Sequence, residues 1–178
     1  LCADYVARAV VELGIDLRPG TLLPAEDLAE ALGVVPRHRR LFGQFLAILV
    51  QVGVLAKERD SWRVLRAPRT ANLDAEARAL LASEPSIEAE LEITARVAPH
   101  LADALRGRKD EAELLFPNGS IESAERLYRD SPTARLFNGL MEQIAAAVCA
   151  ARAQGRTLRV LEVGGGTGGT TAYVLPCL

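Results

Sequence analysis

The sequence has little of what usually marks a nucleic-acid-binding or membrane protein. Its formal net charge is −2, and aromatic residues make up only 4% of its 178 residues. Without an excess of Lys and Arg, the chain has no overall positive field to attract nucleic acid or an anionic membrane. No run approaches the roughly 18 consecutive apolar residues that a membrane-spanning helix needs. We therefore expect protein or small-molecule partners, and neither a nucleic acid nor a membrane.

Cysteine is also scarce, which argues against a disulfide framework. Cys2, Cys149 and Cys177 are odd in number, and their spacing matches no zinc motif. We expect three reduced, mostly packed thiols in a cytoplasmic protein. The hydrophobic content of 49% is sufficient for a folded core. The chain begins with Leu1 rather than Met and ends inside an apolar pattern, which predicts a segment of a longer polypeptide.

Residues 1–70 predict three helices followed by a β-hairpin. Apolar residues recur at helical spacing in three stretches, and a glycine follows each of them. These stretches are 3–13, 25–32 and 37–52. Pro24 and the acidic residues after it mark the start of the second helix. Two β-rich runs, 54–57 and 62–65, flank a polar turn, which is the pattern of a hairpin. Three helices and a hairpin resemble a winged helix.

Residues 71–155 predict a mainly helical region, after a linker over 68–72. Several stretches have helical spacing; the clearest are 74–81, 86–98, 100–106 and 133–153. Ser120 is expected to cap a further helix that begins at Ile121. Gly155 is expected to end the long helix that begins near residue 133.

The last segment, residues 156–178, changes character. A β-rich run over 158–163 is followed by a glycine-rich loop over 164–169, and helical spacing resumes at 170–175. Strand, glycine loop and helix are the opening of a nucleotide-binding α/β fold. Such a strand is normally buried between neighbouring strands. Without them, we expect it to be disordered, swapped or paired with another copy, and about the last 20 residues to pack irregularly.

The glycine loop contains the candidate cofactor-binding residues. Gly164, Gly166 and Gly168 allow the backbone to approach a bound nucleoside where a side chain would collide. Gly164, Gly166 and Gly169 also match the G-x-G-x-x-G spacing of a dinucleotide site, so the glycines alone leave both cofactors open. Glu162 favours a positively charged ligand such as a sulfonium amino acid, because a carboxylate would repel a pyrophosphate. A remaining alternative is a turn that only links a strand to a helix.

A basic cluster over residues 37–40 is the best candidate for contact with DNA. The sequence becomes almost wholly apolar after Arg40, which leaves few polar side chains to read base edges. A winged-helix regulator is therefore the weaker hypothesis, and a protein-docking or lid surface is favoured. His38 and His100 have no second ligand at helical spacing, so we expect them to be surface groups rather than metal ligands.

Residues 160–176, which read VLEVGGGTGGTTAYVLP, resemble the first motif of the C-methyltransferase domains embedded in polyketide synthases. The Thr-Gly-Gly-Thr-Thr continuation and the Leu-Pro ending are more specific than the glycines. Upstream, Leu-Phe-Pro at 115–117 and YRDSPTARLFN at 128–138 are similar to the region that precedes this motif in that family. Residues 1–105 look like the helical N-terminal lid of those domains. The family usually has Ala where this chain has Gly165.

The resemblance implies a mainly α-helical fold with a small β-hairpin, made of a winged-helix-like part over 1–70 and a helical lid over 71–155. The first strand, glycine-rich loop and helix start of a Rossmann-like class I methyltransferase α/β core would follow over 156–178. It implies methyl transfer from S-adenosylmethionine to the α-carbon of a β-ketoacyl thioester on an acyl carrier protein, with neighbouring synthase domains as further partners. Its cofactor-binding residues would be Glu162, Gly164, Gly165, Gly166, Thr167 and Gly168, with Tyr128 reaching the cofactor from the lid.

The resemblance assigns no catalytic residue and no metal ligand within this chain. The catalytic histidine and acid of the family would lie after residue 178, as would the metal ligands of its iron-dependent branch. Three alternatives stay open: Tyr128 could be a core residue, the protein could be a degenerate adaptor without activity, or it could methylate a free small molecule. The last would share every feature except the synthase-like motif.

Overall fold

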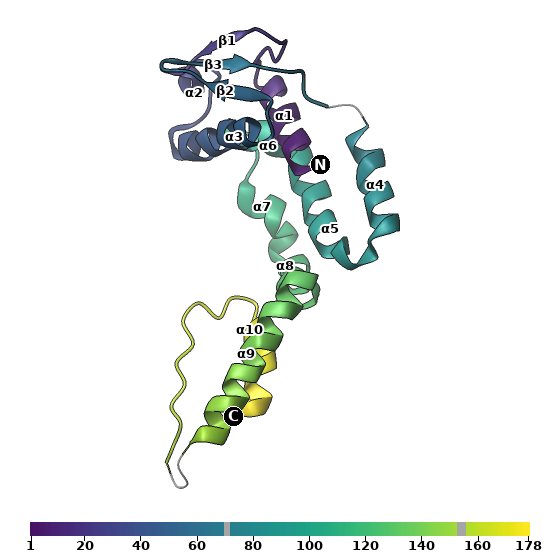
Figure 1. The fold of residues 1–178 in the computed structure, drawn as a ribbon, viewed down its shortest axis with the longest axis vertical. Coiled ribbons are helices and arrows are strands. Elements are labelled where there is room, and N and C mark those ends of the chain that lie inside the picture. The colour runs from purple at the N-terminus through teal and green to yellow at the C-terminus, as the bar shows by residue number, and fades with distance from the viewer. Residues whose placement is uncertain (70–71, 153–155) are drawn as a thin grey trace. The chain divides into compact units, whose positions relative to one another are not determined.

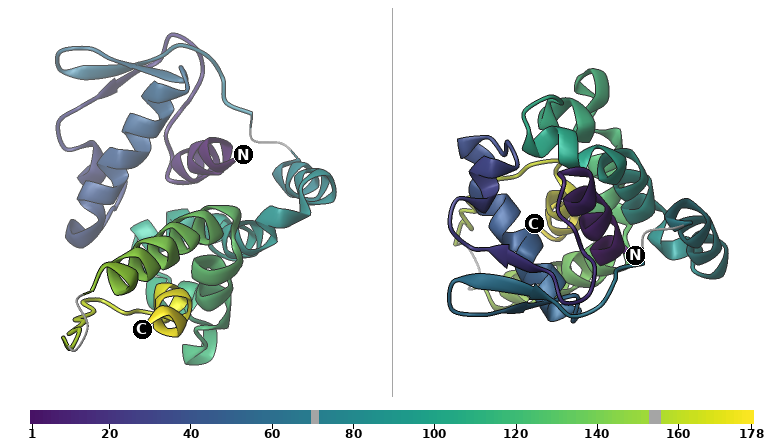
Figure 2. Two further views of the ribbon diagram at one scale, coloured as in Figure 1. Left: turned by 60° about the horizontal axis from the view of Figure 1, so that its bottom comes forward. Right: turned by 90° about the horizontal axis from the view of Figure 1, so that it is seen from above.

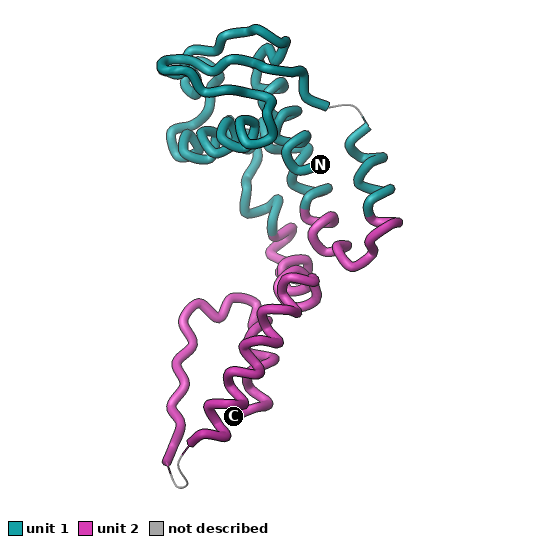
Figure 3. The backbone as a smooth tube through the Cα atoms, in the orientation of Figure 1, with its two compact units in different colours: residues 1–80, 94–115 teal, residues 81–93, 116–178 magenta. Residues whose placement is uncertain are grey.

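The computed structural model describes residues 1–69, 72–152 and 156–178, and it is mostly helical with one small sheet (Figure 1). The chain divides into two compact units, which Figure 3 shows in different colours. Unit 1 comprises residues 1–80 and 94–115, and unit 2 comprises residues 81–93 and 116–178.

Unit 1 combines helices with a three-stranded antiparallel sheet in the order β1-β3-β2. Its elements are α1 (Cys2–Glu12), β1 (Leu22–Pro24), α2 (Leu28–Ala31), α3 (Arg39–Gln51), β2 (Leu55–Lys57), β3 (Ser61–Val64), α4 (Leu73–Ser83, ending in unit 2), α6 (Leu101–Leu105) and α7 (Glu111–Leu115). Short 3-10 turns over Pro36–His38 and Ala98–His100 precede α3 and α6. The predicted hairpin is confirmed as β2 and β3. In Figures 1 and 2, α3 lies beside the sheet.

The predicted second helix is wrong at its start, because Pro24 belongs to a strand. Residues 22–24 form the edge strand β1, in which Leu23 lies opposite Trp62 of β3. Leu23 is buried, so packing outweighs the local helical signal here. An edge strand tolerates Pro24, since the missing N–H need not pair. Asp27 then turns the chain with a φ of 54°, and α2 begins at Leu28.

The core of unit 1 is apolar and is shared by α1, α3, α6 and the sheet. Its most deeply buried side chains include Val10, Leu49, Leu55 and Leu105. Arg106, just after α6, donates hydrogen bonds to the carbonyl oxygens of Leu13 at 3.0 Å and Leu32 at 3.2 Å. These carbonyls lie at the C-terminal ends of α1 and α2, where they lack partners within the helix. The guanidinium of Arg106 therefore connects the C-terminal ends of α1, α2 and α6.

Unit 2 is built from helices and one long irregular segment. Its helices are α5 (Glu88–Val97, ending in unit 1), α8 (Glu122–Asp130), α9 (Pro132–Ala151) and α10 (Gly169–Val174). Short 3-10 turns occupy Pro85–Ile87, Pro117–Gly119 and Leu175–Cys177. The last helix, α10, lies beside α9 in Figures 1 and 2.

Two serines lie near the N-terminal ends of helices in unit 2. The Ser131 Oγ accepts a hydrogen bond from the N–H of Ala134 at 3.2 Å, and Pro132 takes the first position of α9. This is a standard N-cap arrangement. The predicted cap Ser120 lies one residue too early, since Ile121 holds the cap position of α8. Its Oγ still accepts a hydrogen bond of 3.4 Å from the N–H of Glu122.

The predicted strand over 158–163 is not formed in the described part of the chain. These residues run as an irregular segment that leads to α10 (Figure 1). Leu161 and Val163 are each 87% exposed. A strand needs hydrogen-bond partners on a neighbouring strand, and none of the strands described belongs to unit 2. The expectation of irregular packing is confirmed for this segment and is wrong for α10, which packs against α9 as a regular helix.

Some predictions fall on residues outside the described ranges. These are Gly155 as a helix end, part of the linker over 68–72, and the boundaries of the predicted domains 1–70, 71–155 and 156–178. They stay predictions.

Two expectations from composition can be compared with the structure. Within the described ranges, no helix combines the length and the apolar character needed to cross a membrane. Cys149 and Cys177 are partly buried, but Cys2 is exposed, so the expectation of mostly packed thiols is wrong for Cys2.

Candidate functional site

Unit 2 contains a hollow of about 930 Å³ whose walls come from α5, α8, α9, the glycine loop and α10. Small-molecule sites occupy about 300–1,000 Å³ and combine apolar walls with a few polar groups. Most of the predicted cofactor-binding residues line this hollow; they are Tyr128, Gly164, Gly165, Gly166 and Thr167. The structure therefore brings Tyr128 and the glycine loop to one place, although they are far apart in the sequence.

The backbone of the loop explains why glycine recurs in it. Gly164, Gly166 and Gly168 have φ angles of 75°, 55° and 73°. Residues with a Cβ rarely adopt this left-handed region, whereas glycine enters it without strain. Gly168 holds the N-cap position of α10, so the loop runs directly into that helix. The alternating glycines predicted to shape the turn thus have the backbone conformation that only glycine adopts readily.

A fourth glycine has a packing role that the sequence pattern did not specify. Gly169 is the first residue of α10 and is buried against the end of α8. A Cβ at this position would lie 2.7 Å from the backbone oxygen of Tyr128, which is closer than real Cβ contacts come. The absence of a side chain at residue 169 therefore sets how closely the loop approaches Tyr128.

Asn138 of α9 connects α8 and α10 by hydrogen bonds. Its side chain Nδ2 donates to the backbone oxygen of Tyr128 at 3.0 Å, and its Oδ1 accepts from the Thr170 Oγ1 at 2.8 Å. Asn138 is only 5% exposed and lines the hollow. Buried amides need such partners, since an unpaired one costs about 1–3 kcal/mol. Sequence reasoning assigned no role to Asn138 or Thr170, although both lie in the stretches that carry the family resemblance.

Glu162 lies beside the loop rather than on the wall of the hollow. Its carboxylate accepts the Thr171 hydroxyl hydrogen bond, with Oγ1 lying 2.6 Å from Oε1 and 2.7 Å from Oε2. Neither Glu162 nor Gly168 is among the described residues that line the hollow. A Cβ on Gly165 would lie 3.3 Å from the Glu162 carboxyl carbon. In this arrangement, Glu162 connects the two ends of the loop.

Tyr128 is 60% exposed and lines the hollow. The alternative that it is a buried core residue is therefore wrong. Its neighbours on α8 form an ion pair, because Arg129 Nε lies 3.1 Å from Asp130 Oδ1. The hydrogen bond from Arg129 lowers the pKa of Asp130 below its usual value. The ion pair thus favours the ionised form of Asp130 at the end of α8.

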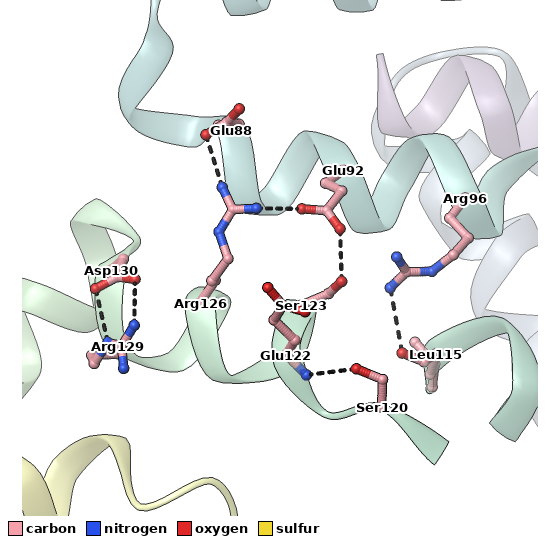
Figure 4. A network of polar contacts seen from close by, with 10 residues as sticks. All are labelled: Glu88, Glu92, Arg96, Leu115, Ser120, Glu122, Ser123, Arg126, Arg129 and Asp130. Atoms are coloured by element: carbon pink, nitrogen blue, oxygen red, sulfur yellow. Dashed lines mark hydrogen bonds and ion pairs between the residues drawn. The ribbon is translucent and has the colours of Figure 1, made fainter. Parts of the chain in front are cut away.

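Charged side chains connect α5 to α8 within unit 2 (Figure 4). Arg126 of α8 lies 2.8 Å from a carboxylate oxygen of Glu88 and 2.8 Å from one of Glu92. The Ser123 hydroxyl also donates to Glu92, at 2.7 Å. Glu88 and Glu92 are four residues apart and share a helix face. These contacts fix the first turns of α5, which contribute a wall to the hollow.

The basic cluster of unit 1 is partly neutralised by acids. Arg37 lies 3.3 Å from Glu111, and Arg39 lies 2.9 Å from Glu30. The His38 side chain is 12% exposed and lies 3.6 Å from Glu111, so the expectation that it is a surface group is wrong. These contacts add to the argument against DNA binding, since paired cations attract phosphates less.

Comparisons with known proteins agree with the motif. No protein-family model matches the chain. The polyketide synthase ThaG of Burkholderia thailandensis is 35% identical over 156 residues, which is 84% of this chain and 3% of that protein. Methylphloroacetophenone synthase of Cladonia uncialis is 32% identical over 183 residues, which is 100% of this chain and 7% of that protein. The chain thus spans less than a tenth of these curated relatives.

Solved structures give the same result at the level of the fold. The CurJ carbon methyltransferase is 34% identical with a TM-score of 0.90, and the alignment covers 99% of this chain and 47% of that one. The DszA carbon methyltransferase is 31% identical with a TM-score of 0.82, covering 99% and 46%. The chain therefore spans about half the length of these domains. It belongs to the carbon methyltransferase domains of polyketide synthases, of which it is the N-terminal portion.

Proposed function

We propose that this chain supplies the lid and the first cofactor-binding loop of an enzyme that transfers a methyl group from S-adenosylmethionine to the α-carbon of a β-ketoacyl thioester. The acyl chain would be held by an acyl carrier protein, and neighbouring synthase domains would be further partners, in a cytoplasmic synthase. The observation that carries the proposal is the hollow of unit 2, which is lined by Tyr128 and the glycine loop.

The residues around the hollow fit this cofactor. The loop glycines leave backbone where a nucleoside can approach closely, and Asn138, Thr167 and Thr170 offer neutral polar groups on the same wall. S-adenosylmethionine would supply an electrophilic methyl group, while this chain's residues would bind and orient the nucleoside and amino acid parts. Glu162, Gly164, Gly165, Gly166, Thr167, Gly168 and Tyr128 remain the proposed binding residues. Glu162 and Gly168 would act by shaping the loop.

We also propose which residue ranges form the separate parts of the domain. Residues 1–70 would form a winged-helix-like part, in keeping with the order of α1, β1, α2, α3, β2 and β3. Residues 71–155 would form the lid, and residues 156–178 would begin the Rossmann-like core. The unpaired segment over 158–163 would become a strand once neighbouring strands of that core are present.

Calorimetric titration of S-adenosylhomocysteine tests the proposal. The ligand is titrated into this chain and into a longer polypeptide that continues through the rest of the methyltransferase domain. Binding by the longer polypeptide is the expected result, with weaker or no binding by the chain alone. Binding by neither would overturn the proposal and favour the alternative, a methyltransferase-derived adaptor without activity.

A further inference from the structure

The hollow of unit 2 has two different ends, which lie at opposite ends of α8. Tyr128 is near the C-terminal end of this helix, and its backbone oxygen lies against Gly169 of the glycine loop. Ile121 holds the N-cap position at the other end. At a rise of about 1.5 Å per residue, Ile121 and Tyr128 are roughly 10 Å apart along the helix axis. Figure 4 shows this length of helix, from Glu122 to Asp130. The glycine loop thus covers only one end of the wall that α8 provides.

The end near Ile121 presents large apolar side chains. Ile121 and Ala124 line the hollow from α8, and Phe116 lines it from just before the 3-10 turn over Pro117–Gly119. Glu90 of α5 also lines the hollow, and it already has an interaction within the chain. Phe116 and Ile121 are both exposed, although apolar side chains gain from burial. Single exposed apolar residues are common, but two that share a hollow of ligand size are typical of a binding surface.

A carbon methyltransferase has to hold two ligands at once. The methyl group and the carbon that attacks it must lie about 3–3.5 Å apart in the reactive complex, so the substrate shares the site with the cofactor. Bare backbone and neutral polar groups at the Tyr128 end suit the nucleoside and amino acid parts of the cofactor. The apolar end, roughly 10 Å away, suits a hydrocarbon chain that extends from the reacting carbon.

We propose that Phe116 and Ile121 contact the hydrocarbon part of the acyl thioester and favour long acyl chains over short ones. This inference rests on the proposed function and adds specificity-determining residues to it. Each further methylene group that is buried against these side chains should improve affinity by up to about fourfold. The expected substrate is therefore a β-ketoacyl thioester with an extended aliphatic chain rather than an acetoacetyl thioester.

The test uses the longer polypeptide that contains the whole methyltransferase domain. Methylation of acetoacetyl and β-ketooctanoyl thioesters of N-acetylcysteamine is measured, and the ratio of the two kcat/KM values defines the chain-length preference. We expect Ile121→Ala and Phe116→Ala each to lower the preference for the longer chain about fivefold, because less apolar surface remains to cover it. Affinity for S-adenosylhomocysteine, measured by calorimetry, should be unchanged, since both residues lie away from the glycine loop.

Ile144→Ala is the matched control. Ile144 is 55% exposed, close to the 53% of Ile121, and it lies on α9 outside the set of described residues that line the hollow. The substitution removes the same atoms, so the chain-length preference should stay the same. An equal change in Ile144→Ala and Ile121→Ala would overturn the inference, because a general loosening of the domain would explain both.

Cofactor binding separates the other outcomes. An unchanged chain-length preference in both Ile121→Ala and Phe116→Ala overturns this inference and leaves the proposed function intact. Weaker binding of S-adenosylhomocysteine with an unchanged preference also overturns it, because the two residues then contact the cofactor. If the unsubstituted domain binds no S-adenosylhomocysteine or methylates neither thioester, the proposed function is wrong, and this inference with it.

A second measurement does not depend on a variant being folded. With the unsubstituted domain, KM is determined for a series of β-ketoacyl thioesters that differ by one methylene group at a time. We expect KM to fall as the chain lengthens, because each added group is buried against the apolar end of the hollow. A KM that does not change with chain length would contradict a role for Phe116 and Ile121.

Discussion

A single missing side chain controls how closely the glycine loop approaches α8. Gly169→Ala would place a Cβ 2.7 Å from the Tyr128 oxygen, and that oxygen belongs to the backbone, so it cannot rotate away. We expect the loop to shift, the free energy of unfolding to fall by about 1–3 kcal/mol, and affinity for S-adenosylhomocysteine to drop in the whole domain. Thermal unfolding and calorimetry measure the two effects.

The control for this variant lies nearby. Gly139→Ala adds the same methyl group in the middle of α9, where a Cβ would have nothing within 4 Å. Alanine is favoured over glycine inside a helix by about 0.5–1 kcal/mol, so this variant should be slightly more stable. Equal behaviour of the two variants would show that the contact with Tyr128 does not matter.

Tyr5 gives unit 1 a dependence on pH. Its hydroxyl donates a hydrogen bond of 3.0 Å to Asp74 Oδ1, between α1 and α4. Burial, followed by this hydrogen bond, raises the pKa of Tyr5 above 10.0. The protonated hydroxyl is therefore favoured in the folded state. Its contribution to stability is complete below pH 10.0 and is lost as the pH rises toward the folded pKa.

Tyr5→Phe tests this contribution. At neutral pH, we expect the variant to lose about 1 kcal/mol, the value of one hydrogen bond. The difference from the unsubstituted chain should shrink at pH values above 10.0, because phenylalanine has no proton to lose. Chemical denaturation at several pH values measures it. A difference that stays constant through this range would contradict the assignment.

Between elements, the link that defines the site is the one through Asn138. It connects the end of α8, the middle of α9 and the start of α10. Thr170→Val removes one hydrogen bond and leaves the buried Asn138 oxygen without that donor. We expect a loss of about 1–3 kcal/mol and faster hydrogen exchange in α10. Thr170→Ser keeps the hydroxyl and should lose much less stability. A Thr170→Val variant as stable as the unsubstituted chain would contradict this role, because valine keeps the methyl group and lacks only the hydroxyl.

The sequence predicted these elements unevenly, for physical reasons. Helical spacing followed by glycine located α1 and α3, and the β-hairpin was recognised from its polar turn. The start of α2 was wrong because pairing of Leu23 with β3 is a long-range contact that local pattern does not contain. The segment over 158–163 has the composition of a strand, but composition does not provide the neighbouring strands that would pair with it.

The residues of the candidate site were also predicted only in part from the sequence. Tyr128 and the glycine loop were predicted from motif residues, and the structure places them around one hollow. Asn138 was not predicted, because its role depends on which helices meet at the hollow. Glu162 was predicted for its charge, yet its carboxylate contacts Thr171. Motifs indicate which residues contact a cofactor, while packing decides which side chains face it.

For the whole chain, the exposed apolar surface of unit 2 predicts self-association. Leu161 and Val163 stand in solvent on an unpaired segment, and Phe137 and Ile144 are exposed on α9. Unpaired backbone next to apolar side chains is a template for pairing with another chain. Covering one such side chain is worth about 1.5–3 kcal/mol. We therefore expect this chain to form concentration-dependent oligomers, measured by sedimentation velocity.

Substitutions test whether this exposed surface of unit 2 mediates the self-association. The double variant Leu161→Ser with Val163→Ser should weaken self-association at least about tenfold, because two apolar side chains no longer gain from burial. Leu65→Ser, which changes an exposed leucine of unit 1, serves as the control and should have little effect. If the unsubstituted chain stays monomeric at every concentration, the prediction of self-association is wrong. If the Leu65 variant alone dissociates the oligomer, the association surface lies on unit 1.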